Sequence, residues 1–154
     1  MTGSRSAPSA WAWALGAGGL VPFVGLAATL AFAPMAWRPA AGNALLGYGA
    51  LIVGFLGGIH WGLAMTGDSA RPSPASLLWG VVPSLLGWVA LLSGTLPGLV
   101  LVAASLWLCV AVDAASYARR GLRAWLPLRL ALTVVASSAC LAAAFVLVRG
   151  GAVA

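Results

Sequence analysis

Residues 43–66 read NALLGYGALIVGFLGGIHWGLAMT, an apolar run in which His60 is the one side chain that can carry a charge near pH 7. A bilayer core about 30 Å thick is crossed by about 20 consecutive apolar residues in an α-helix. A helix on the surface of a soluble protein needs a continuous polar face, and this run does not provide one. The stretch therefore predicts a membrane-spanning helix whose glycines and histidine contact other helices.

The composition extends this prediction to the rest of the chain. Of the 154 residues, 62% are hydrophobic and 6% are charged, whereas soluble domains carry about 25% charged residues. The formal net charge is +6, and all eight basic residues are arginines spread between apolar runs. A nucleic-acid-binding face would need clustered basic residues on a polar surface. We therefore expect an integral membrane protein that binds no nucleic acid.

Five runs are long and apolar enough to cross a bilayer, which predicts an all-α bundle that forms a single transmembrane domain over residues 1–154. Asn43 is expected to cap the second helix, and Ser73 followed by Pro74 to begin the third. The segment SGTLPG at 93–98 is so short that the third and fourth helices should form an antiparallel hairpin. The predicted helices cover residues 9–33, 43–66, 74–93, 97–117 and 127–148.

The arginines predict the orientation of the bundle, because basic residues concentrate on the cytoplasmic side. Arg38 and Arg149 would lie on one side, and six arginines on the other: Arg5, Arg71, Arg119, Arg120, Arg123 and Arg129. We therefore expect a cytoplasmic N-terminus, a periplasmic C-terminus and a location in the bacterial inner membrane. The first run, with AFA at 31–33, imitates a cleavable signal peptide, but it exceeds the usual apolar length of about 7–15 residues.

Residues near the predicted helix ends indicate contact with lipid headgroups. Arg119, Arg120 and Arg123 precede Trp125 and are expected at the inner surface, where an arginine gains about 1 kcal/mol from anionic lipids. Tryptophans near helix ends are typical of an interfacial aromatic belt. The tryptophans assigned to this belt are Trp11, Trp13, Trp37, Trp79 and Trp125.

Small residues recur every four positions in the second helix. Ala50, Gly54, Gly58 and Gly62, continued by Thr66, predict a groove along one face. Helices in a membrane associate by close van der Waals contact, which such small residues permit. The groove would serve packing within the chain or, alternatively, an interface between subunits. Because His60 lies nearly opposite the groove and is costly to expose to lipid, the second helix is expected to be central.

Charges at unfavourable helix ends predict a polar cluster. Asp113 lies near the C-terminal end of the fourth helix, and Arg129 just inside the N-terminal end of the fifth, so each opposes the helix dipole. A mutual contact would compensate both, and His60 is predicted at a similar depth. Tyr117 shares the face of Asp113 and completes the predicted cluster. It would be either an ion pair that fixes helix register or a proton- or ligand-binding site.

Other chemical sites are not indicated. The single histidine cannot supply two axial haem ligands, and the sequence contains no metal-binding pair of carboxylates, nucleotide-binding loop or serine-nucleophile motif. Cys109 and Cys140 stand in apolar runs without metal-ligand spacing. We therefore expect no catalytic residues, no metal and no cofactor.

Several blocks resemble the family defined by the domain of unknown function numbered 3429. GGLVPFVGLA at 18–27, YGALIVGFLGGIHWG at 48–62 and VVPSLLGW at 81–88 are similar to its early signatures. Asp113 and WLPLRLALT at 125–133 are similar to its late ones, whereas AASYARRGLRA at 114–124 is richer in arginine than expected. The resemblance implies a small multi-spanning inner-membrane protein of bacteria and mitochondria, without an activity to transfer.

Three functions remain open at this point. The first is an accessory, assembly or structural role, with membrane lipids and a larger inner-membrane complex or a homo-oligomer as partners. The second is a small transporter or proton-conducting protein that uses His60, Asp113 and Arg129. Five spans do not make the even-numbered inverted repeat that is common in transporters. An intramembrane enzyme ranks last, because no nucleophile–base pair is recognisable.

Overall fold

The computed structural model describes residues 7–66 and 74–151, which form five long α-helices and two short 3₁₀ turns. All five helices are long and apolar enough to cross a membrane. The chain is therefore an all-helical, multi-pass membrane protein. The helices are α1 (Ala10–Phe32), α2 (Arg38–Met65), α3 (Pro74–Leu92), α4 (Thr95–Arg120) and α5 (Leu126–Gly151), and the turns are η1 (Met35–Trp37) and η2 (Arg123–Trp125).

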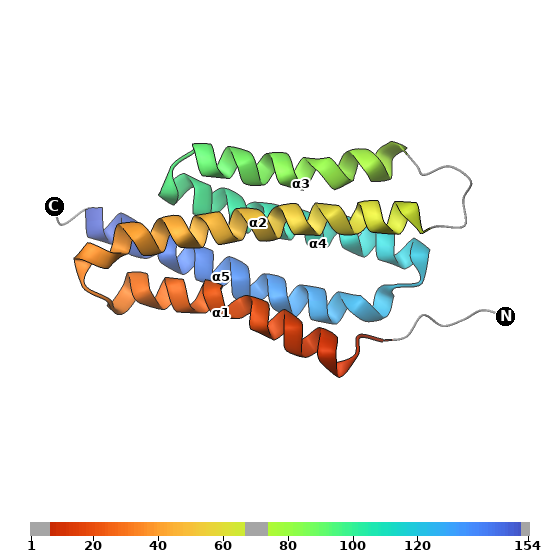
Figure 1. Ribbon diagram of the computed structural model, residues 1–154, viewed down its shortest axis with the longest axis horizontal. Coiled ribbons are helices and arrows are strands. Elements are labelled where there is room, and N and C mark those ends of the chain that lie inside the picture. The colour runs from red at the N-terminus through yellow and green to blue at the C-terminus, as the bar shows by residue number, and fades with distance from the viewer. Residues whose placement is uncertain (1–6, 67–73, 152–154) are drawn as a thin grey trace.

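The helices lie side by side in one bundle, with α3 at one edge and α1 at the other (Figure 1). Helix α2 contacts each of the other four helices. This confirms the prediction that the second helix is central. The start of α1 and the end of α5 lie at opposite ends of the bundle, as an odd number of crossings requires (Figure 1).

The second helix begins earlier than the sequence predicts. It starts at Arg38, with Pro39 in its first turn, so Asn43 lies inside the helix and does not cap it. Proline favours this position because its fixed φ suits the first turn and its missing N–H leaves no donor unsatisfied. The Asn43 side chain instead accepts a hydrogen bond of 2.7 Å from the hydroxyl of Thr95. The predicted cap Ser73 lies outside the described residues.

Two short connections set the register of α3, α4 and α5. Ser93 and Gly94 alone separate α3 from α4, and Gly94 has a φ of +82°, which favours glycine. Helix α4 ends at Arg120 and is capped by Gly121, which has a φ of +68°, and η2 then leads directly into α5. Both pairs are therefore antiparallel neighbours (Figure 1), and the last turns of α4 lie beside the first turns of α5.

Helices α2 and α3 approach so closely that some of their glycines leave no room for a side chain. A Cβ atom on Gly57 would collide with the backbone oxygen of Gly80, and one on Gly87 would stand 2.8 Å from that of Ala50. Pro83, inside α3, is buried and would lie 3.2 Å from the same Cβ of Gly57. Close backbone contact of this kind is how small residues join helices in a membrane.

Only part of the predicted groove of small residues contacts α3. Ala50 and Gly54 face α3, and a Cβ on Gly54 would stand 3.3 Å from the Ser84 hydroxyl. Gly58 and Gly62, in contrast, are exposed on the outside of the bundle and have open space where a Cβ would stand. The physical reason is that an α-helix turns about 100° per residue, so a four-residue repeat drifts by about 40° at each step. The contact with α3 therefore continues through Gly57 instead.

Candidate functional site

Three ionisable side chains from three helices meet inside the bundle. Nε2 of His60, on α2, lies 2.9 Å from Oδ1 of Asp113, on α4. Nε of Arg129, on α5, donates to Oδ2 of the same carboxylate at 2.7 Å. The side chains of His60 and Asp113 are 3% and 4% exposed, and that of Arg129 is 11% exposed. We call these three residues the polar triad.

The positions of the triad follow from the connections described above. Asp113 lies two turns before the end of α4, and Arg129 lies in the first turn of α5. The antiparallel packing of the two helices brings these positions to one level. His60 lies near the C-terminal end of α2, which contacts α4 along its length. The triad is therefore closer to the end of the bundle where α2 ends and α5 begins.

The charges of the triad balance. Two hydrogen-bonded opposite charges are tolerated in an apolar interior far better than either alone. Because the carboxylate of Asp113 can only accept, His60 must carry its proton on Nε2 when it is neutral. Its other ring nitrogen, Nδ1, then remains an acceptor and makes no hydrogen bond to the residues that the structure describes.

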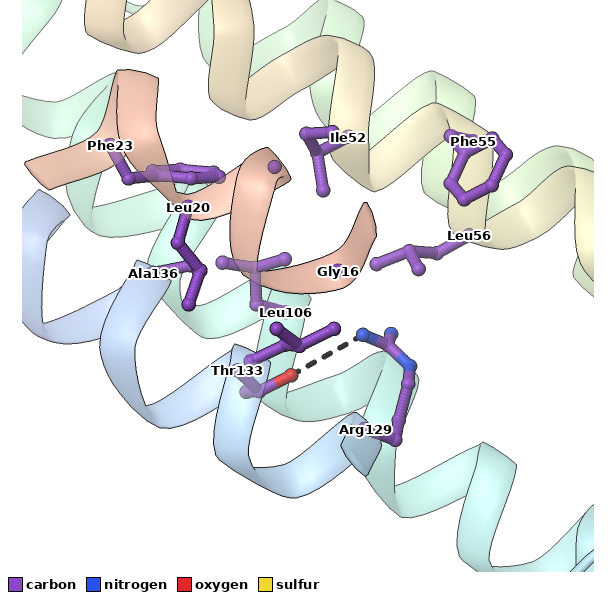
Figure 2. Close-up of a pocket in the computed structure, with 12 residues that line it drawn as sticks. Gly16, Leu20, Phe23, Ile52, Phe55, Leu56, Leu106, Arg129, Thr133 and Ala136 are labelled. Carbon is purple, nitrogen blue, oxygen red and sulfur yellow. Dashed lines mark hydrogen bonds between the residues drawn. The ribbon is translucent and has the colours of Figure 1, made fainter. Parts of the chain in front are cut away.

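A pocket of about 140 Å³ lies beside Arg129, between α1, α2, α4 and α5. Figure 2 shows the guanidinium turned toward Thr133 at one edge of this pocket, with aromatic and aliphatic side chains such as Phe23 and Leu56 around the rest. Nη1 of Arg129 donates to the Thr133 hydroxyl at 3.4 Å. Nη2 is buried and has no hydrogen-bond partner among the described residues. The pocket is therefore an apolar space with one polar edge.

A second pocket, of about 310 Å³, lies on the His60 side of the triad. It is bordered by the first turn of α3 and by the last turns of α4. We call it the arginine pocket. Its lining residues are His60, Ala75, Ser76, Trp79, Val112, Ser116, Arg119 and Arg120.

The remaining predicted site residues have different surroundings. Tyr117 is buried one turn after Asp113, but within the described part of the chain it makes no hydrogen bond to the triad. Arg119 and Arg123 are exposed, as lipid-facing arginines should be. Arg120 is half-buried and donates to the carbonyl oxygen of Leu63 at 2.9 Å, so it joins α4 to α2 instead of facing lipid alone.

Two contacts that α3 makes at the site are not predicted by the sequence. Nη2 of Arg120 donates to the Ser76 hydroxyl at 3.2 Å. The ring of Trp79, assigned above to the interfacial belt, meets the His60 ring edge-on at a centroid distance of 6.3 Å. Neither pairing of α3 with another helix leaves a signal in the sequence. The hydrogen bond from Arg129 to Thr133 could have been predicted, because Thr133 stands four residues after Arg129 on the same helical face.

Comparison with known proteins places the chain in a family. A model of a family described as a protein of unknown function (DUF3429) matches residues 8–146. Transmembrane protein 69 of Xenopus tropicalis is 43% identical over 79 residues, which cover 51% of this chain and 31% of that relative. The matched segment thus represents less than a third of the relative. No solved structure matches the chain. Because the family model covers nearly the whole sequence, the chain belongs to the DUF3429 family.

Proposed function

We propose that this protein is an accessory or assembly protein of a bacterial inner membrane, which acts by binding a partner within the bilayer. Its N-terminus would lie in the cytoplasm and its C-terminus in the periplasm, as the arginine distribution favours. The partner would be a subunit of a larger membrane complex or a second copy of the chain. The family supplies no activity that would argue for a different role.

The observation that carries this proposal is the glycine pair on the outside of α2. Gly58 and Gly62 are one turn apart and exposed, and a Cβ on either would meet no other atom within 4 Å. Leu51 and Phe55 continue this outer surface and are 73% and 67% exposed. In a membrane, exposed small residues one turn apart permit another helix to approach closely. The surface therefore suits a partner helix.

Filling this surface tests the proposal. The double substitution Gly58→Leu and Gly62→Leu should weaken association about tenfold, which corresponds to about 1.4 kcal/mol. The fold should be retained, because both positions have open space. The measurement is native mass spectrometry of mild-detergent extracts, which weighs the assemblies that contain the chain.

Two glycines of α1 provide the matched control. Gly18 and Gly25 are also exposed and also have open space, so the double substitution Gly18→Leu and Gly25→Leu should leave the assemblies intact. Equal loss of the assemblies in both double variants, or loss in neither, would contradict a docking role for Gly58 and Gly62.

A second candidate function, proton conduction or transport, has one observation in its favour. The Asp113 carboxylate is buried between His60 and Arg129, and His60 also borders a pocket. Intramembrane ionisable groups often mark proton or ion routes. However, the interior between the triad and the end of the bundle where α2 and α4 begin is lined by apolar side chains that are at most 2% exposed. They include Phe23, Leu30, Leu45, Leu99, Val102 and Leu106. This packing favours the accessory role.

A flux measurement separates the two candidates. Proteoliposomes that contain the protein are expected to dissipate a pH gradient no faster than empty vesicles, and Asp113→Asn should change nothing. Proton flux in the wild-type protein that disappears in Asp113→Asn would overturn the accessory role in favour of conduction.

A further inference from the structure

Within the described parts of the chain, the arginine pocket gathers positive charge without a matching negative charge. Arg119 and Arg120 border it, and the side chains that line it among the described residues include no carboxylate. Asp113 carries the one side-chain carboxylate among the described residues, and it already accepts hydrogen bonds from both His60 and Arg129. Arg120 is held in place by the Leu63 carbonyl and the Ser76 hydroxyl. The pocket is thus bordered by the guanidinium of Arg120, which hydrogen bonds hold in place, and by that of Arg119, which is exposed.

We propose that the arginine pocket binds a phosphate group, carried by a lipid headgroup or by a free phosphate ion. This site is distinct from the glycine surface of α2 and does not depend on the accessory role. Guanidinium groups bind phosphate oxygens through charge-assisted and often paired hydrogen bonds. The volume of about 310 Å³ accommodates a phosphate with part of its substituent.

Polar groups from α3 and α4 border the space that a phosphate would occupy in this pocket. Arg119 makes no contact with the other described side chains that would compete for its guanidinium. Ser76 accepts from Arg120 and retains its own O–H for a phosphate oxygen. Ala75 and Ser76 stand in the first turn of α3, where the helix dipole favours an anion.

His60 is a buried polar residue that borders the arginine pocket. It is 3% exposed, it borders the pocket, and its Nδ1 makes no hydrogen bond to described residues. A phosphate monoanion can donate its O–H to Nδ1 as a neutral acceptor, and a protonated His60 can donate to a phosphate oxygen. The pocket therefore suits phosphate in either protonation state.

Binding of inorganic phosphate tests the proposal. Titration calorimetry of the full-length protein in a neutral maltoside detergent should show saturable binding. Arg119→Gln should weaken it about fivefold, the loss expected for one arginine near an anionic group. Arg123→Gln is the matched control, because Arg123 is exposed at the same end of the bundle but does not border the pocket. Ser76→Ala should weaken binding as well.

A competition arm distinguishes the two sources of phosphate. If the site accepts a headgroup, short-chain phosphatidylglycerol should displace inorganic phosphate from the wild-type protein. If it accepts only the free ion, the lipid should not compete. Either result supports a phosphate site. Absence of saturable binding by both probes, or equal weakening by Arg119→Gln and Arg123→Gln, would overturn it.

Discussion

Replacing Asp113 by leucine is expected to lower the free energy of unfolding by about 3–5 kcal/mol. The substitution removes the acceptor of both other triad members and leaves the Arg129 guanidinium charged and 11% exposed without its counter-ion. An unpaired charge in an apolar interior is far less favourable than a paired one. The measurement is reversible unfolding in mixed micelles with an increasing fraction of SDS.

A second buried polar residue of α4 provides the control. Ser105 is 2% exposed, and its hydroxyl has no hydrogen-bond partner in the described part of the chain. Ser105→Ala should therefore leave the stability unchanged or raise it slightly, because it removes an unsatisfied polar group. If Asp113→Leu were as well tolerated as Ser105→Ala, the triad would contribute nothing to the fold.

Two adjacent glycines are expected to respond in opposite ways to the same substitution. Gly57→Ala should lower the free energy of unfolding by about 1–3 kcal/mol, because the added methyl group would collide with the backbone of Gly80 and push α2 and α3 apart. Gly58→Ala adds the same group one residue later, into open space. Alanine is a better helix former than glycine, so this variant should be neutral or stabilised by up to about 1 kcal/mol.

The same SDS titration measures both variants, and each serves as the control for the other. Equal changes in the two variants would contradict the close contact between Gly57 and Gly80. A larger loss for Gly58→Ala would mean that the α2 surface that contacts α3 has been assigned incorrectly.

The spans could be predicted from the sequence because hydropathy alone identifies them. Each of the five helices keeps a long apolar run, and the short segment at 93–98 already required a hairpin between the third and fourth. The first residue of the second helix was harder to predict. Asn43 is a good cap by residue type, but Pro39 allows the helix to begin at Arg38. The preference of asparagine for a helix cap therefore did not decide where α2 begins.

The packing of α2 could be predicted only in part. A four-residue spacing indicates small residues on one side, but its drift around the helix moves Gly58 and Gly62 away from α3. The depth of Asp113 and Arg129 in the bilayer and their positions against the helix dipoles predicted that the two side chains meet. In the structure Nε of Arg129 lies 2.7 Å from Oδ2 of Asp113. They could not predict the anchoring of Arg120 on Leu63, because it depends on how the ends of α2 and α4 meet.

The most direct test of the buried triad is a double-mutant cycle of Asp113→Leu and Arg129→Met, followed by SDS unfolding. Replacing a buried ion pair by apolar residues of similar size is often neutral, whereas removing one partner is strongly destabilising. We predict that each single variant is destabilised and that the double variant regains most of the lost stability. Losses that simply add would contradict a direct pairing of these two side chains inside the bundle.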